Sequence, residues 1–397
     1  MLPYLGNMID HYDKALYGAL APYLAITLSP SDPLWGLVST YCLLPVTWLA
    51  RPIGAWLWGS LARRYDHVAI LRWTLGGMGL VTLGMGALPL AQNQPTICLL
   101  SWGGMKALQQ LFSAGESPAS TLLAMEKGSA QERPFRGAIN GSAAMIGVLL
   151  AFSGVALLHQ IDYMESGWRG LYVVGGLLSL LLAKGRVKRI ERQSPKATSL
   201  YPLFTSSFFC IVALSALSYA IYELATHLMY ALGCASFSFT WRQSSQHQLF
   251  FLVLDILLLP FFGWIGMKVG VRRCILSALV LIFCLSPFLF LALSSSLHPL
   301  IIRSLFTLLG TSLSAPLYAF YHAISPPRDR LKIIAMGVAI GGHGLGSFMT
   351  LIALASYRSY GSYMIPSLYL VLLAGLALYS TYSLNRKEGS FIPARVQ

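Results

Sequence analysis

Long apolar segments alternate with short polar links along the whole chain. A helix that crosses the hydrocarbon core of a bilayer needs about 20 mostly apolar residues. Segments of that length recur about twelve times, with boundaries good to a few residues. They cover residues 5–28, 34–61, 68–91, 95–122, 136–160, 168–185, 203–232, 245–267, 273–296, 299–323, 332–356 and 361–384. This pattern predicts an all-α integral membrane protein with about twelve transmembrane helices.

One link near the middle of the chain is longer and more basic than the others, and it runs from Lys184 to Leu200. The chain also repeats itself weakly at a distance of about 200 residues, because the stretch that starts at Gly59 is echoed by the one that starts at Gly263. Parallel halves of this kind are common in secondary transporters. We therefore predict two pseudo-symmetric six-helix bundles with a linker and a tail. These are residues 1–185 and 203–385 for the bundles, 186–202 for the basic linker and 386–397 for the cytoplasmic tail.

Composition and charge agree with a lipid environment. The chain is 56% hydrophobic and 11% charged, whereas soluble domains carry about 25% charged residues. Its net charge of +14 comes from basic residues that lie mostly in alternate links and in the tail. Positive charge marks the cytoplasmic side of a membrane protein. We therefore expect no nucleic-acid partner, and we predict a multi-pass protein of the bacterial inner membrane, a plasma membrane, with both termini in the cytoplasm.

The six cysteines have no metal-ligand spacing, and most of them lie inside apolar segments. Free cysteine in such a place behaves as a small hydrophobic residue. The sequence also lacks the His-Glu-x-x-His motif, the Gly-x-Ser-x-Gly motif and a phosphate-binding glycine loop. We expect no disulfide framework, no metal, no cofactor and no enzymatic activity.

The first apolar segment carries a stripe of polar residues. Asp10, Asp13, Lys14 and Tyr17 are spaced three and four residues apart, which places them on one face of a helix. Asp10 and Lys14 can pair on that helix, whereas Asp13 has no partner along it. We predict Asp13 as the proton-coupling acid, with Asp10 as a second candidate, and Tyr17 as a substrate contact. The alternative is that Asp10 and Lys14 only neutralise each other near a helix end.

Further polar residues interrupt the second and fourth segments. Arg51 lies well inside the second segment, and Lys106, Gln109 and Glu116 follow one side of the fourth. Charges inside a membrane usually face a cavity or a partner, and arginine suits carboxylates. We predict that Arg51, Lys106 and Gln109 bind substrate and that Glu116 is a third proton-coupling candidate. Structural pairing, or repair of a helix kinked at Pro118, is the alternative.

The seventh segment has aromatic and polar residues at helical spacing, among them Tyr222 and Glu223. Aromatic rings can hold a quaternary ammonium group. We predict that Tyr222 and Glu223 contact the substrate, with helix packing as the alternative.

Several of these residues lie in motifs that resemble the metabolite:proton symporter branch of the major facilitator superfamily. That branch includes carriers of proline or betaine, of 2-oxoglutarate and of other organic acids. The resemblance covers most of the N-terminal half and implies two six-helix bundles that work by alternating access. Its motifs are Gly6-Asn7-x4-Tyr12-Asp13, Arg51-Pro52-Ile53-Gly54-Ala55-x3-Gly59, Lys106-x2-Gln109-x5-Gly115-Glu116 and Gly167-Trp168-Arg169.

The resemblance also implies a gating role for the loops after the second and eighth segments. Arg63 stands where the family usually has an aspartate, and Asp66 is the nearest substitute for that acid. The first segment also starts without the usual cytoplasmic lead-in, as in a trimmed family member or a chain whose start codon is assigned too late. The gating candidates are Gly59, Arg63, Arg64, Asp66, Gly263, Gly270 and Arg272.

Together these features predict a secondary active transporter whose partners are protons, a small solute and the lipid bilayer. The intramembrane cations Arg51, Lys106 and Arg303 favour a solute that carries a carboxylate, such as proline, betaine or 2-oxoglutarate. We expect proton-coupled symport by a monomer. A proton-coupled efflux antiporter and a transporter-like membrane sensor are the alternatives.

Overall fold

The computed structural model describes most of the chain, and every regular element in this part is a helix. Of the predicted residues, Arg63, Asp66, the linker 186–202 and most of the tail lie outside it. The described residues are 2–28, 32–41, 49–62, 64–65, 67–88, 95–126, 128–185, 205–235, 239–293, 298–327 and 329–387.

The helices group into two compact units, each assembled from several parts of the chain. Unit 1 comprises Met1–Ser120, Ala143–Thr198 and Tyr230–Val253, and unit 2 comprises Thr121–Ser142, Ser199–Met229 and Leu254–Gln397. Three long helices therefore contribute to both units. These are α6 (Pro95–Glu126), α7 (Arg133–Gln160) and α11 (Trp241–Val269). The predicted bundle boundaries, 1–185 and 203–385, stay a prediction.

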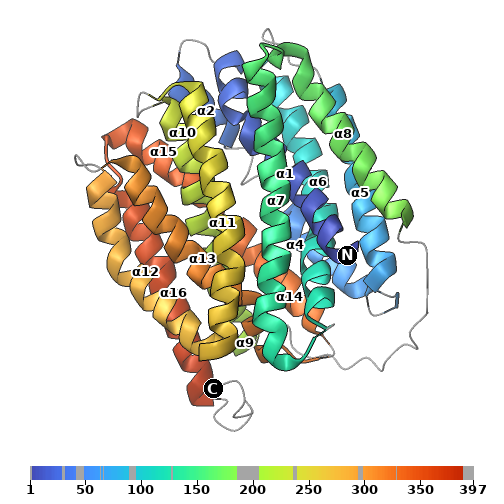
Figure 1. Cartoon of the computed structure of the whole chain (residues 1–397), viewed down its shortest axis with the longest axis vertical. Helices are drawn as coiled ribbons and strands as arrows, with labels where there is room; N and C mark the ends of the chain where they lie inside the picture. Colours follow the sequence, from blue (N-terminus) through green and yellow to red (C-terminus); the bar gives the residue numbers. More distant parts are fainter. Residues whose placement is uncertain are drawn as a thin grey trace. The chain divides into compact units, whose positions relative to one another are not determined.

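Unit 1 is built mainly from helices of the first half of the chain. Within it, α5 packs along α8, and α1 packs against α2 and α8 (Figure 1). The remaining elements are α1 (Leu2–Leu28), α2 (Pro33–Tyr41), α4 (Ala50–Leu61), α5 (His67–Ala87), α8 (Met164–Gly185) and α10 (Met229–Ala235).

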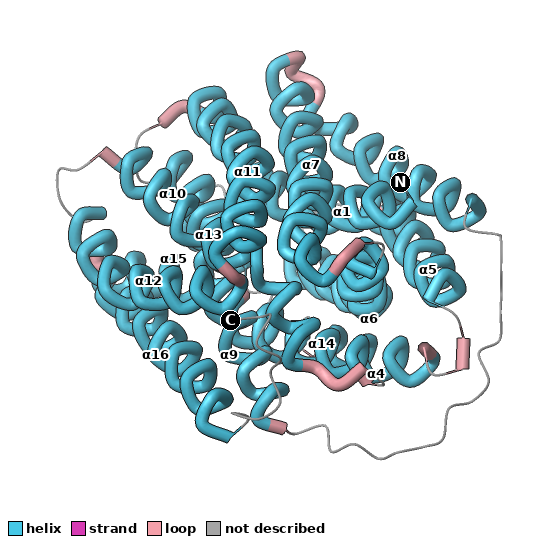
Figure 2. The backbone as a smooth tube through the Cα atoms, turned by 60° about the horizontal axis from the view of Figure 1, so that its bottom comes forward, coloured by secondary structure: helices cyan, strands magenta, loops and turns pink. Residues whose placement is uncertain are grey.

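Unit 2 is built mainly from helices of the second half. In it, α9 packs against α16 and against the π-helical segment η3. Helix α12 packs against α13 and α16 (Figure 2). Its elements are η1 (Ala130–Glu132), α9 (Ser206–Tyr222), η2 (Glu223–Leu228), α12 (Val271–Leu293), α13 (Pro299–Ile324), α14 (Arg330–Val338), η3 (Ala339–Gly346), α15 (Phe348–Tyr360) and α16 (Met364–Lys387).

The helix ends follow local sequence signals. Thr205 caps α9 by accepting a hydrogen bond from the amide of Phe208, and α13 begins with Pro299, which has no amide hydrogen to leave unpaired. Gly361 ends α15 with φ of 62°, a conformation that glycine adopts without strain. Short polar links therefore suffice to separate the helices.

Nine stretches in the described part are long and apolar enough to cross a membrane. The three other predicted segments correspond to α1, to α2 with α4, and to α6. α1 and α6 carry charged candidate residues, which lower their average hydropathy, whereas α2 and α4 have 9 and 12 residues and are each too short to count. The predicted all-α membrane fold is confirmed.

Helices α1 and α7 approach each other so closely that only glycine fits at Gly147. A side-chain carbon there would overlap the carbonyl oxygen of Met8 and lie 2.9 Å from the amide nitrogen of Tyr12. We therefore expect Gly147→Ala to force the helices apart and to destabilise the fold by about 1–3 kcal/mol, as overpacking does. The measurement is the thermal unfolding midpoint of the purified protein. Gly170→Ala on α8 is the matched control, because a carbon at Gly170 meets nothing within 4 Å. Equal midpoints for the two variants would contradict this prediction.

Candidate functional site

The polar stripe of α1 lies in the interior of unit 1. Asp10 and Asp13 are both fully buried. Asp10 forms the predicted ion pair with Lys14, whose Nζ lies 2.6 Å from Oδ2, and it also accepts a hydrogen bond of 2.7 Å from Ser113 Oγ of α6. The negative charge of Asp10 is therefore balanced within unit 1.

Asp13 has a different environment. Its Oδ2 accepts hydrogen bonds from Thr82 Oγ1 of α5 at 3.2 Å and from Ser179 Oγ of α8 at 2.9 Å. Its Oδ1 has no hydrogen-bond donor among the described residues. Gly175 of α8 leaves room for this oxygen, since a side-chain carbon there would overlap it. Asp13 is thus a buried acid that is held by two hydroxyl groups and has no cation in contact in the described part of the chain.

Lys106 is a buried cation on α6 whose hydrogen-bond partners are neutral. Its Nζ donates to the carbonyl oxygen of Lys14 at 3.0 Å and to Gln109 Oε1 at 2.9 Å. It also lies 5.2 Å from the centre of the Tyr17 ring, which attracts cations through its face. No carboxyl group of the described residues lies within ion-pair distance of it.

Gln109 connects Lys106 to Asp13. Its Oε1 accepts a hydrogen bond from Lys106, and its Nε2 donates one of 3.2 Å to Thr82 Oγ1. Because Thr82 donates to Asp13, a single chain of hydrogen bonds runs from the ammonium group to the carboxyl group. We name Asp13, Thr82, Lys106 and Gln109 the α1–α6 site.

Tyr17 contacts both Lys106 and helix α2. Its ring faces Lys106, and its hydroxyl donates a hydrogen bond of 2.7 Å to the carbonyl oxygen of Thr40. The structure therefore brings four predicted residues together: Asp13, Lys106, Gln109 and Tyr17.

Arg51 and Glu116 are also buried in unit 1, where each has a hydrogen-bond partner outside the α1–α6 site. The guanidinium group of Arg51 donates to Gln110 Oε1, and Glu116 accepts a hydrogen bond of 3.0 Å from Thr74 Oγ1. The predicted roles of Arg51 in substrate binding and of Glu116 in proton coupling stay predictions.

Glu223 lies in unit 2, on the π-helical segment η2. Its Oε2 is 3.0 Å from His227 Nδ1 and accepts a hydrogen bond of 3.1 Å from Thr350 Oγ1 of α15. The ring of Tyr222 stands edge-on to that of His227, with 5.6 Å between their centres. Within unit 2 these residues form a compact polar group, and their predicted contact with substrate stays a prediction.

Sequence reasoning did not select Thr82, Ser179 and Thr350 as site residues. Each is a hydroxyl residue within a long apolar segment, where it often bonds only to its own helix. No spacing rule connects them to an acid on another helix.

The described gating candidates lie near helix ends or where two helices approach closely. Gly59 is buried in α4 and Arg64 lies in the turn that follows this helix. Gly263 of α11 lies against α7, since a side-chain carbon there would be 3.1 Å from the carbonyl oxygen of Pro134. Gly270 has φ of 103° between α11 and α12, and Arg272 is in the first turn of α12. The positive φ explains why glycine is needed at this junction.

Several curated proteins are similar in sequence to this chain, although no protein-family model matches it. A putative metabolite transport protein of Haemophilus influenzae is 27% identical over 52% of each chain, so this match spans about half the length of the relative. The alpha-ketoglutarate permease of Escherichia coli is 23% identical over 96% of this chain and 92% of its own. The citrate-proton symporter of Salmonella typhi is 24% identical over 70% and 67%, respectively. These relatives are transporters rather than enzymes, in agreement with the prediction that the chain is not an enzyme.

Among solved structures, the major facilitator superfamily proton:xylose symporter XylE, bound to 6-bromo-6-deoxy-D-glucose, superposes with a TM-score of 0.74. The match covers 99% of this chain and 94% of that protein at 12% identity, so it establishes the fold alone. Fold and sequence similarity agree with each other and with the motifs of the N-terminal half. The chain is therefore an integral membrane protein with the major facilitator fold, and its sequence resembles the metabolite-transport branch of that superfamily.

Proposed function

We propose that the chain is a proton-coupled symporter that moves a small carboxylate-bearing solute by alternating access. The observation that supports this most is the hydrogen-bonded chain from Lys106 through Gln109 and Thr82 to Asp13. Among the described residues, it links a buried cation without a carboxylate contact to a buried acid without a cation contact.

Lys106 is the group that would bind the solute. Burying an ammonium group is costly unless an anion or several hydrogen-bond acceptors compensate it. The carbonyl oxygen of Lys14, the amide oxygen of Gln109 and the ring of Tyr17 each supply only part of a charge. A solute carboxylate that reaches Lys106 would supply a full negative charge.

Asp13 is the group that would carry the proton. A carboxyl group inside a membrane is stable either with a bound proton or with a nearby cation. Since Gln109 joins Lys106 to Thr82, a change in the charge balance at Lys106 would reach Asp13 through hydrogen bonds. Solute binding and proton binding would thereby influence each other, as symport requires.

The relatives support the same class of solute. Citrate and alpha-ketoglutarate, the solutes in the names of two similar proteins, both carry carboxylates, and one of those names states symport with protons. We propose that this chain shares carboxylate recognition with these two relatives and that the rest of its solute differs from theirs.

Uptake into vesicles tests this proposal with a matched pair of competitors. We expect accumulation of a labelled solute such as proline only when a proton gradient is imposed. Excess unlabelled proline should compete with the label, whereas prolinamide, which lacks the carboxylate, should compete at least about tenfold more weakly, the usual effect of one lost charged hydrogen bond. 2-Oxoglutarate and betaine are the next labels to be tried in the same assay.

Equal competition by proline and prolinamide would show that the protein does not recognise the carboxylate of the solute. Extrusion of solute against its gradient in exchange for protons would favour the efflux antiporter. Solute binding without any transport would favour the membrane sensor.

We also propose that the protein lies in a bacterial inner membrane as a monomer with both termini in the cytoplasm. The concentration of basic residues in alternate links and in the tail supports the cytoplasmic position of the termini. A cysteine introduced between residues 184 and 200 should react with an impermeant reagent only from the cytoplasmic side. Reaction of this cysteine from outside intact cells would show that the link is extracellular and would contradict the predicted topology.

A further inference from the structure

An acid and a histidine lie together in the interior of unit 2, on the π-helical segment η2. Glu223 Oε2 is 3.0 Å from His227 Nδ1, and the two side chains are only 9% and 11% exposed, respectively. Single π-helical turns occur frequently at functional sites of proteins. We name Glu223 and His227 the η2 pair.

Thr350 of α15 fixes the position of the carboxylate. Its Oγ1 donates a hydrogen bond of 3.1 Å to Glu223 Oε2 and lies 3.3 Å from the backbone carbonyl oxygen of the same residue. The oxygen that faces His227 is therefore also held from a second helix. A hydroxyl group supplies a hydrogen bond but no charge, so Thr350 does not balance the charge of the acid.

His227 is the residue that can supply this positive charge. Among the described residues, no lysine or arginine lies within ion-pair distance of Glu223. Within unit 2, η2 packs against α9, α13 and α15. The charged and titratable side chains on these three helices are Cys210, Tyr219, Tyr222, Arg303, Tyr318, Tyr321, His322, Tyr357, Arg358 and Tyr360. Asp255 of α11 is a further acid, an electrostatic neighbour of Tyr222.

The η2 pair is neutral only when it holds one proton. With the proton on the imidazole, a cation faces an anion, and with the proton on the carboxyl group both residues are neutral. Loss of this proton to water leaves one uncompensated negative charge in a membrane interior, which is costly. The 3.0 Å separation lets either residue hold the proton and donate it in a hydrogen bond to the other.

Two other pairs in the chain lack this property. Asp10 and Lys14 have the same four-residue spacing in unit 1, but lysine ordinarily stays charged up to about pH 10. His343 of η3 lies 2.9 Å, through Nε2, from the hydroxyl group of Tyr219, which is ordinarily neutral below about pH 10. The η2 pair instead joins an acid to the side chain whose ordinary charge change falls between about pH 5 and 8.

We propose that Glu223 and His227 form a second proton-binding site, in unit 2 and separate from Asp13. The proton comes from water and returns to water. Because Thr350 bonds to the carboxylate from α15, the charge of the site acts on the contact between η2 and α15. The site needs no solute, so it stands or falls independently of the proposed symport.

The test is infrared difference spectroscopy of the full chain in lipid nanodiscs without solute, between about pH 5 and about pH 8. The vibration of a carboxylate changes when it binds a proton or when a hydrogen-bonded partner gains charge. Four proteins are compared: wild type, E223Q, H227K and H343Q. H343Q is the matched control, because it removes a histidine of the same unit whose partner is a neutral hydroxyl.

We expect the wild type and H343Q to share a carboxylate band in the difference spectrum and E223Q to lose it. H227K should lose the band as well, because lysine stays charged at both pH values and the carboxylate stays paired. If E223Q does not fold, H227K alone makes the assignment. The proposal is overturned if the wild type lacks the band, or if the folded variants E223Q and H227K both retain it at the wild-type intensity.

Discussion

Asp13→Asn is expected to abolish proton-driven accumulation of solute while leaving solute binding and solute exchange measurable. Asparagine has nearly the same shape as aspartate, and its side-chain oxygen can still accept from Thr82 and Ser179, which hold Asp13 in unit 1. It cannot carry a proton under physiological conditions. The measurement compares uptake under an imposed proton gradient with exchange of labelled for unlabelled solute at equal pH.

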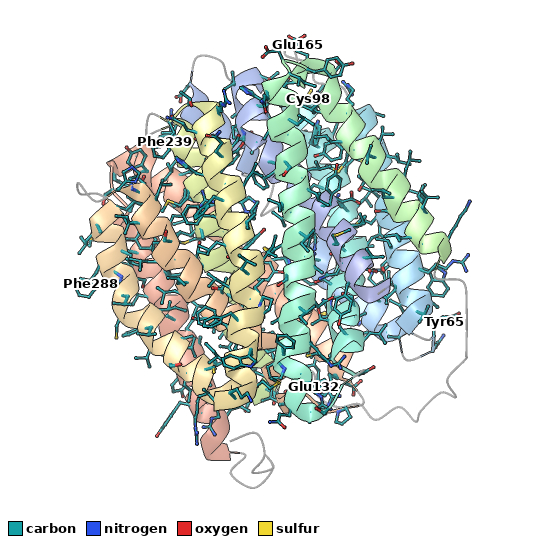
Figure 3. All side chains as sticks on the ribbon, in the orientation of Figure 1. Tyr65, Cys98, Glu132, Glu165, Phe239 and Phe288 are labelled. Atoms are coloured by element: carbon teal, nitrogen blue, oxygen red, sulfur yellow. The ribbon has the colours of Figure 1, made fainter. Side chains whose placement is uncertain are left out.

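The control for this experiment is Glu165→Gln. Glu165 is an exposed acid in the first turn of α8, labelled in Figure 3, so its replacement should leave both uptake and exchange unchanged. If the Asp13→Asn protein still concentrates solute against a gradient, the coupling acid lies elsewhere. Glu116 would then be the next residue to replace, because it is also a fully buried acid.

Lys106→Met is expected to lower the apparent affinity for a carboxylate solute by a factor of about ten or more, which is the range for losing one charge-assisted hydrogen bond. Methionine fills a similar volume but cannot meet the negative charge of the solute. Lys106→Arg should retain most of the affinity, because arginine keeps the charge and has suitable donors. The measurement is the concentration dependence of uptake for each variant.

A second readout separates solute recognition from a purely structural role for Lys106. In the wild type, we expect the acid of a matched pair to compete better than its amide, and Lys106→Met should remove this preference. Loss of a structural contact alone would reduce transport without changing the ratio of the inhibition by the acid to the inhibition by the amide. Lys184→Met, at the exposed end of α8, is the control for removing a lysine. An unchanged preference for the acid in Lys106→Met would assign carboxylate recognition to another cation, with Arg51 next.

The chain's helical segments could be predicted because each depends on residues close together in sequence. The length of an apolar segment reports whether it can cross the bilayer, whatever it packs against. The Asp10–Lys14 ion pair has the same origin, since residues four apart meet on one face of any helix. The polar stripe of α6 was predicted for the same reason, and Lys106 and Gln109 do bond to each other at three-residue spacing.

The partners of the site residues across helices could not be predicted in this way. Whether Asp13 meets Thr82 and Ser179 depends on how far α5 and α8 are rotated and shifted relative to α1. A rotation of one residue position, about 100°, would turn these hydroxyls toward other neighbours. Hydropathy does not report such rotations, because lipid-facing and helix-facing positions are both apolar.

The sequence by itself determined that this protein is a bundle of membrane-spanning helices, and it also determined which helices carry buried charge. Only the tertiary structure decided that Lys106 reaches Asp13 through Gln109 and Thr82, because those groups come from three helices. The close approach that makes such contacts possible depends on small residues such as Gly147 and Gly175, whose missing side chains leave room for a neighbouring helix. Segment length and polarity are properties of one helix, whereas contact geometry is a property of several helices packed together.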